Sequence, residues 1–347
     1  MPQIILRNWR LAVRFTITSA LIAGAMIAGT ERGAHTSVVE GASPVAEQKR
    51  AATPARKTPT PTATNSVYGC GASNVDHQQL LTDTFTHLRA AGVTVVRFWA
   101  FQSYAMDGNG ARNWSALDRV FASAEQNGIA LVPVLGNNWT DCDYWPLSAY
   151  PNGGQRKDST NWYAGAYLSP YDGYQVDYIS WLKEITVRYA TRPSVRAWEL
   201  VNEPQADSYS DTDYTSFAAF LKRSRDAIRA TGATAPISFG SMGTGQPGFD
   251  NARYAQMVRE ADLGTAHDYG FDNEPLPRSA GCNENCIRTA LGDMLAAGKR
   301  FFIGETGIDA CDTDTRASQF IAKIDAAFRG GAWGYMLWAY DERAVRG

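Results

Sequence analysis

The chain has 347 residues, of which 44% are hydrophobic, and its formal net charge at pH 7 is −2. This length allows one large domain or two small ones. The near-neutral charge argues against a nucleic acid or another acidic polymer as partner, because either would require a basic surface. Ten tryptophans and sixteen tyrosines supply many flat rings, which suit a core and also suit stacking against sugars.

The first 30 residues have the pattern of a secretion signal. Arg7, Arg10 and Arg14 precede an apolar run over residues 15–29, and small residues lie near the end of that run. The run is shorter than the roughly twenty residues that a membrane-spanning helix needs. We therefore predict a secreted protein. If the segment is not cleaved, it becomes a membrane anchor and the rest of the chain faces the outside.

Residues 31–65 are rich in Ala, Thr and Pro and show no apolar periodicity. This composition predicts an extended linker rather than a domain. The remainder, residues 66–347, is the predicted globular domain.

Cysteine usage fits an exported chain. Cys70 lies in an apolar segment and is our candidate for a free thiol, whereas the other four can pair in an oxidising compartment. Their connectivity is not set by the sequence. A zinc site is not expected, because no Cys-x-x-Cys occurs and the chain has four histidines in total. We expect no other metal and no cofactor. The four cysteines in predicted loops are Cys142, Cys282, Cys286 and Cys311.

After the linker, strand-like and helix-like segments alternate in chain order. Strands are predicted over residues 67–72, 93–99 and 129–135, from Val195, over 235–240 and 263–267, from Phe301, and over 332–338. Helices are predicted over residues 77–91, 114–127, 174–189, 214–230, 251–261, 287–297 and 315–328, and a long loop over 136–170.

Eight strands alternating with helices predict an α/β fold with a parallel sheet, closed into a (β/α)8 TIM barrel. A doubly wound open sheet is the alternative, but no glycine-rich phosphate turn leads from the first strand into a helix. Nine residues follow Trp338, too few for a full closing helix. Either other segments close the barrel or the last helix is missing.

Two glutamates stand where predicted strands end. Glu203 follows the apolar segment that begins at Ala197 and precedes Pro204, which cannot continue a strand. Glu305 follows the Phe301 strand and is flanked by glycines that would let a ligand approach. A single such glutamate would be an ordinary solvated carboxylate. Two of them predict a glycosidase pair, in which one glutamate is the acid/base and the other is a nucleophile or a base.

Other polar or aromatic residues fall at the same predicted edge, where the active sites of TIM barrels lie. Taken singly, each has a structural explanation: His267 as a core histidine, Trp139 and Trp338 as packing residues, Arg97 as an ion-pair partner. An arginine in a buried strand needs a carboxylate, and Glu305 is a candidate. Together they predict a substrate site comprising Arg97, Trp99, Asn138, Trp139, Asn202, His267, Tyr269 and Trp338.

The segments that carry these residues resemble the signature segments of glycoside hydrolase family 5, and within that clan the endo-β-1,4-mannanases. The resemblance extends over about residues 66 to 340 and rests on five segments: 96–101, 137–139, 198–204, 264–269 and 304–307. The Asn-Glu-Pro segment is shared across the clan, whereas Arg-x-Trp and Asn-Asn-Trp are typical of mannanases. After Tyr269 the chain departs from the family, because it continues Gly-Phe-Asp.

The resemblance implies a retaining double displacement. Glu305 would attack the anomeric carbon, and Glu203 would protonate the leaving oxygen and later deprotonate water. Asn202 would hold the sugar 2-hydroxyl, and Arg97 and Tyr269 would orient Glu305. His267 would line the cleft, and Trp338 would carry the sugar beside the cleaved bond.

We therefore predict a hydrolase of β-1,4-mannan or a related polysaccharide or oligosaccharide, acting as a monomer. A cellulase or other β-glucanase on the same scaffold is the nearest alternative, because the two substrates differ in the orientation of one hydroxyl. An alternative from another class is a non-catalytic sugar-binding barrel, since a fold does not fix a function.

Overall fold

The computed structural model describes residues 77–139, 143, 159–170, 174–269, 287–308 and 313–338, together with two short strands near the N-terminus. Those strands, β1 (Gly29–Thr30) and β2 (His35–Thr36), pair with each other in antiparallel orientation. The rest of the predicted signal and linker, the strand predicted over 67–72 and all five cysteines lie outside the described residues. None of the described helices is long and apolar enough to cross a membrane.

Seven parallel strands form one curled sheet in which every strand pairs with its neighbours in sequence. Each strand after the first follows a helix, so the chain advances around the sheet in one direction. The strands are β3 (Val95–Trp99), β4 (Ala130–Val134), β5 (Trp198–Glu199), β6 (Ile237–Ser238), β7 (Leu263–Asp268), β8 (Arg300–Thr306) and β9 (Gly334–Tyr335).

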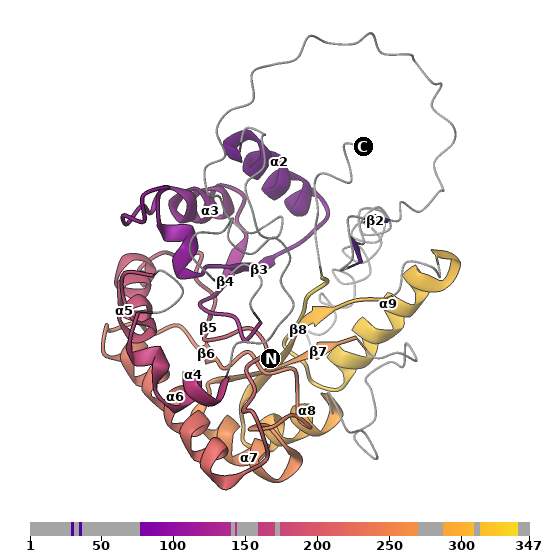
Figure 1. Cartoon of the computed structure of the whole chain (residues 1–347). Helices are drawn as coiled ribbons and strands as arrows, with labels where there is room; N and C mark the ends of the chain where they lie inside the picture. The colour runs from indigo at the N-terminus through magenta and orange to yellow at the C-terminus, as the bar shows by residue number, and fades with distance from the viewer. Residues whose placement is uncertain are drawn as a thin grey trace, which may run out of the picture.

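The helices lie around the outside of the curled sheet (Figure 1). Those that match the predicted alternation are α2 (His77–Ala90), α3 (Ser115–Gln126), α5 (Tyr178–Tyr189), α6 (Asp211–Arg229), α7 (Asn251–Glu260), α8 (Ile287–Ala296) and α9 (Thr313–Arg329).

Side-chain caps set the starts of three of these helices. Asp177 accepts a hydrogen bond from the Ser180 amide, so α5 begins at Tyr178 rather than at the predicted residue 174. Ser210 accepts from the Asp213 amide, so α6 begins three residues earlier than predicted. Asp250 caps α7 in the same way.

The segment predicted as a loop over 136–170 is partly helical. It contains α4 (Ser159–Ala164) and the short 3-10 helix η4 (Ala166–Leu168). Trp162 and Tyr163 in α4 are buried, and their rings lie 5.0 and 4.9 Å from that of Phe220 in α6. The aromatic residues of this segment therefore belong to the core, which the loop prediction missed.

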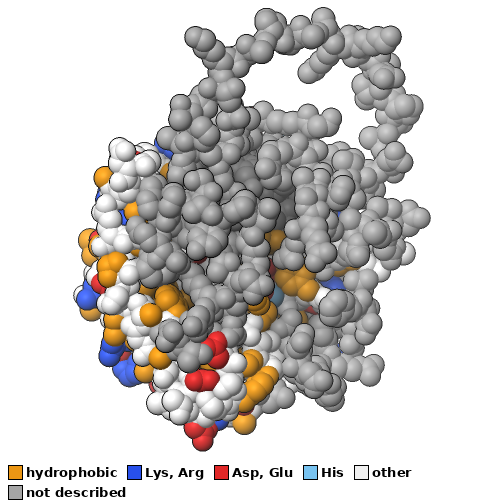
Figure 2. All heavy atoms as spheres, in the orientation of Figure 1, with side chains coloured by type: hydrophobic (Ala, Val, Ile, Leu, Met, Phe, Trp, Pro, Cys, Tyr) orange, Lys and Arg blue, Asp and Glu red, His pale blue; other side chains and the backbone are white. Residues whose placement is uncertain are grey.

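The main core fills the space between the sheet and the helices, and a smaller apolar cluster joins the strands themselves. The latter consists of Val132, Ala197, Leu263 and Phe302. Arg97 lies opposite Val132 in the register of β3 with β4, so the two side chains leave the sheet on the same face. On the face in Figure 2, acidic, basic and apolar side chains mix in small groups over the described part.

Candidate active site

Arg97 in β3 is the centre of a buried network that joins three strands. Its Nη1 donates to Glu305 Oε1 at 2.6 Å, and its Nη2 donates to Asn202 Oδ1 at 2.7 Å. Nε and Nη2 also donate to Glu199 Oε1, at 2.9 and 2.5 Å. The Arg97 side chain is 3% exposed. The expected partner Glu305 is thus present, but the sequence analysis missed Glu199, which shares the guanidinium.

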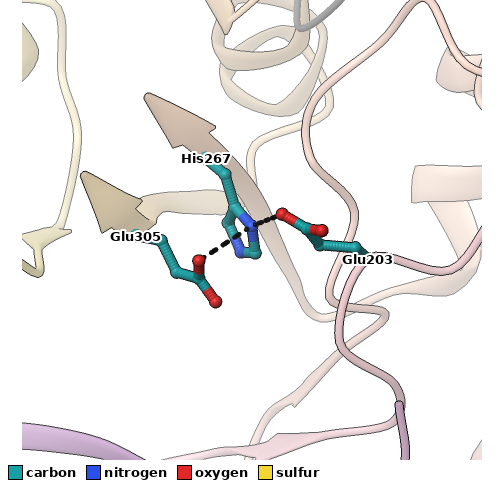
Figure 3. Close-up of side chains that lie close together, drawn as sticks. All are labelled: Glu203, His267 and Glu305. Atoms are coloured by element: carbon teal, nitrogen blue, oxygen red, sulfur yellow. Dashed lines mark hydrogen bonds and ion pairs between the residues drawn. The ribbon is translucent and has the colours of Figure 1, made fainter. Parts of the chain in front are cut away.

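Glu203 and Glu305 lie on opposite sides of the His267 imidazole (Figure 3). Nδ1 of His267 is 2.6 Å from Glu203 Oε1 and 3.6 Å from Glu305 Oε2. One ligand-type atom of each of the three side chains lies within 4.8 Å of those of the other two. His267 is fully buried, whereas the Glu203 side chain is 15% exposed. Two carboxylates from distant parts of the chain therefore share one small site.

A bulge brings Glu305 level with His267. In the pairing of β7 with β8, Ala266 lies opposite Ile303 but His267 lies opposite Glu305, so Gly304 is an extra residue. A Cβ at Gly304 would lie 2.8 Å from Thr265 Oγ1 and 3.3 Å from His267 Nε2.

The glycines around Glu305 leave space for neighbouring side chains of the site. A Cβ at Gly307 would lie 2.6 Å from Cε1 of the Tyr269 ring, just as one at Gly304 would crowd His267. The two glycines make room for Thr265, His267 and Tyr269, while their role in letting a ligand approach stays a prediction.

The backbone of Glu203 is strained. Its φ is 51°, and it is the single non-glycine residue with a positive φ in the described part of the chain. The Glu203 amide donates to the carbonyl of Gly240 at 3.0 Å, which ties this turn to the segment after β6. A Cβ at Gly240 would lie 1.8 Å from the Val201 carbonyl oxygen, so glycine is required for this close approach.

The Asn-Asn-Trp segment after β4 reaches the site through its tryptophan. Trp139 Nε1 donates to Glu203 Oε2 at 2.5 Å. Asn138 is buried, and its Oδ1 accepts from the hydroxyl of Tyr163 at 2.9 Å. That arrangement favours a bracing role for Asn138 over the predicted contact with substrate.

Asn202 and Asn137 are joined side by side. Asn202 Nδ2 donates to Asn137 Oδ1 at 3.1 Å, while Asn202 Oδ1 accepts from Arg97. Asn202 is 6% exposed. The same residue thus contacts Arg97 and borders Glu203, as a group that holds a sugar hydroxyl beside the acid must do.

Three aromatic residues complete the site. The hydroxyl of Tyr269 donates to Glu305 Oε2 at 2.8 Å, so both oxygens of Glu305 accept from donors. Trp338 is half-buried, and its ring centroid lies 5.1 Å from that of Trp99. Trp99 is buried beneath the guanidinium of Arg97, which makes it a support rather than an open platform.

The charges of the site act on one another because water is largely excluded. Burial would raise the pKa of Glu203, but the hydrogen bonds from His267 and Trp139 bring it below its ordinary value. Burial, together with the negative charge of Glu203, raises the pKa of Glu305 against the opposing charges of His267 and Arg97. Burial lowers the pKa of His267, but the two carboxylates outweigh it and raise that pKa. The two directions favour a protonated imidazole at His267 beside an ionised Glu203.

Glu203, His267 and Glu305 are also a set of donors that a metal ion could use. A divalent cation there would face the guanidinium of Arg97, which already contacts Glu305 at 2.6 Å. Of the two cations that face Glu305, Arg97 at 2.6 Å is closer than His267 at 3.6 Å, and the donor set fits acid/base chemistry better than metal binding.

The comparisons with known proteins agree with this geometry. Residues 56–342 match the family model described as cellulase, glycosyl hydrolase family 5. The chain is 26% identical to mannan endo-1,4-beta-mannosidase A of Hypocrea jecorina over 300 residues, which are 76% of this chain and 63% of the relative. It thus spans less than two thirds of that relative's length. It is 25% identical to the Podospora anserina enzyme of the same name, covering 76% of this chain and 74% of that one.

Among solved structures, the hyperthermostable endo-1,4-beta-D-mannanase of Thermotoga petrophila superposes with a TM-score of 0.59 at 20% identity. The match covers 76% of this chain and 87% of that one. This likeness, with the curled parallel sheet, confirms the predicted TIM-barrel fold class over the open-sheet alternative. Because the family model matches residues 56–342, which are most of this chain, the chain belongs to glycoside hydrolase family 5.

Proposed function

We propose that this protein hydrolyses β-1,4-mannan-type polysaccharide with retention of configuration, through Glu203 and Glu305. The observation that carries the proposal is their separation: ligand-type oxygens of the two side chains lie within 4.8 Å. Retaining glycosidases hold their carboxyl groups about 5–5.5 Å apart, whereas inverting ones leave about 6.5–9.5 Å for a water molecule.

Hydrogen bonding supports the two proposed roles. Glu305 accepts from Arg97 and Tyr269, which hold it in place as the nucleophile. Its raised pKa keeps it more basic than an exposed carboxylate. It attacks the anomeric carbon, and the bond to the leaving oxygen breaks.

Glu203 acts as acid and then as base. It receives the proton of the His267 imidazole, whose Nδ1 lies 2.6 Å from Glu203 Oε1, and passes that proton to the leaving oxygen. Glu203 then removes a proton from the water that attacks the glycosyl–Glu305 ester. His267 compensates for the lowered pKa of Glu203, because the imidazole holds the proton 2.6 Å from the carboxylate.

Mannan is the favoured substrate because the curated relatives cited above are named mannan endo-1,4-beta-mannosidases. A β-glucanase is the second candidate, since the matching family model is described as cellulase. Both candidate substrates are polysaccharides that a secreted enzyme would meet outside the cell. This agrees with the secretion-signal pattern of the first 30 residues.

The test compares hydrolysis of mannan, glucomannan and carboxymethyl-cellulose, and follows the anomer first released from a manno-oligosaccharide by proton NMR. We expect turnover of mannan and glucomannan and initial release of the β-anomer. Glu203→Gln and Glu305→Gln should each reduce turnover by at least about a hundredfold. Initial release of the α-anomer would exclude the retaining mechanism, and failure on all three polymers would favour a non-catalytic sugar-binding barrel.

A further inference from the structure

We propose that Glu199 is a positioning residue that sets the nucleophilic strength of Glu305 by sharing the charge of Arg97. This inference rests on the proposed function, because it assigns a regulating partner to the nucleophile of that reaction. Glu199 lies in β5 and makes no direct contact with the substrate side of the site in the described structure; it acts through the arginine.

The geometry divides one positive charge between two carboxylates. Arg97 directs Nε and Nη2 to Glu199 Oε1 and directs Nη1 to Glu305 Oε1. The three side chains are 3%, 0% and 6% exposed, so solvent screens their charges little. Glu199 takes two of the donor groups and Glu305 takes one.

The second oxygen of Glu199 strengthens the effect. Oε2 is buried and has no hydrogen-bond partner in the described part of the structure. Arg97 therefore supplies every hydrogen bond that this carboxylate receives in the described part of the structure, and it supplies them to Oε1 alone. A buried acceptor left in this way costs stability, and its presence needs an explanation in function.

The consequence for Glu305 follows from electrostatics. A nearby cation favours the ionised form of a carboxyl group and makes it a weaker base, whereas a nearby anion has the opposite effect. Glu199 cancels part of the field of Arg97 at Glu305. Glu305 therefore remains a stronger base, and a stronger nucleophile, than Arg97 alone would leave it.

The other charged or titratable groups that face Glu305 come from two further segments. His267 and Tyr269 approach from β7 and the residue after it, and Glu203 approaches from the turn after β5. These groups are unchanged when Glu199 is altered, so a change at Glu199 reports its charge through Arg97.

Glu199→Gln tests the proposal, because the amide keeps the shape of the side chain and an oxygen for Arg97 while it removes the charge. The measurement is the pH dependence of kcat/KM with dinitrophenyl β-mannobioside. Its leaving group needs no proton, so the acid limb reports Glu305 rather than Glu203. We expect that limb to move to lower pH by about one unit in the variant and the plateau to fall several-fold.

Glu199→Asp and Glu125→Gln are the matched variants. The aspartate keeps the charge but holds it farther from Arg97, so the limb should move in the same direction by less. Glu125 pairs with Arg192 at 2.8 Å outside the site, and its substitution should leave the limb unchanged.

An acid limb that stays in place in both Glu199 variants would overturn the proposal. A larger displacement in Glu199→Asp than in Glu199→Gln would also overturn it, since geometry rather than charge would then be responsible. If Glu199→Gln does not fold, Glu199→Asp alone is the test: a shift of the acid limb to lower pH supports the proposal, and an unshifted limb overturns it. A wild-type enzyme without activity on any β-mannoside or β-glucoside would instead refute the proposed function itself.

Discussion

Glu305 lies directly opposite His267 in the pairing of β7 with β8, although the pair before them is Ala266 with Ile303. The extra residue, Gly304, advances β8 by one position and turns Glu305 into the mouth of the barrel. A single backbone irregularity therefore brings the proposed nucleophile Glu305 opposite His267.

Gly304→Ala should damage activity far more than folding. The added methyl group would press on Thr265 Oγ1 and on the His267 ring. We expect kcat to fall by about tenfold to a hundredfold, because displacements of about 1 Å at an active site have effects of that size. Steady-state kinetics and thermal unfolding measure the two effects. In Gly292→Ala, the control, a Cβ meets nothing within 4 Å; equal kinetics in both variants would contradict the prediction.

Arg97→Lys should lose most of its catalytic activity even though the positive charge is kept. A lysine ammonium cannot present three donor groups in one plane to Glu199, Asn202 and Glu305. We expect kcat/KM to fall by about a hundredfold, measured on mannan. Arg188→Lys is the control: Arg188 pairs with Asp118 at 2.6 Å, with side chains 40% and 43% exposed. That change should cost less than about 1 kcal/mol of stability and leave kcat/KM unaltered. Full activity in Arg97→Lys would show that the planar set of donor groups of Arg97 is unnecessary.

Glu305→Gln should be more stable than the wild type at neutral pH. The folded-state pKa of Glu305 is raised, so the folded protein favours the protonated form. The carboxyl group therefore destabilises the fold once the pH rises through that pKa, and has no such effect below the pKa of the unfolded chain. We expect a gain in Tm of about 2–4 °C at pH 7 that disappears near pH 4. Calorimetry across this range measures it, and a gain that grows on acidification would contradict the sign.

Lys323→Met should strongly destabilise the fold. Lys323 in α9 contacts Asp268 at 2.6 Å, and both side chains are buried. Removing one partner leaves an uncompensated buried charge and costs about 3–5 kcal/mol in free energy of unfolding. The double variant Lys323→Met with Asp268→Asn should recover part of that loss. Urea unfolding of Lys323→Met, Asp268→Asn and the double variant completes a double-mutant cycle. Strictly additive losses in free energy of unfolding would show that the two side chains are not coupled.

Much of the fold was predictable because periodicity and glycine signals act locally. The alternation of apolar strands with helices gave each matched element to within a few residues. Contacts between distant strands were harder to foresee. Glu199 was missed, although a carboxylate inside an apolar strand is as unusual as Arg97 in its own strand, and this shared oddity was the available signal.

The roles of small residues could not be inferred from the sequence for a related reason. Gly304 adds one residue to β8 and leaves space for His267, but a glycine beside a glutamate is equally compatible with an approaching ligand. Asn138 is similar: its position after β4 placed it at the correct edge, whereas its bond to Tyr163 depends on how α4 packs. Such assignments require the three-dimensional register.

The left-handed backbone at Glu203 has an evolutionary consequence. At this conformation glycine is the residue of lowest energy, so folding alone gives no reason to retain a glutamate there. Random substitution would tend to relax the turn while leaving the barrel intact. The carboxylate, which contacts His267 and Trp139, accounts for a glutamate here, so a glycine at position 203 should relax the turn and leave the barrel folded without its proposed acid.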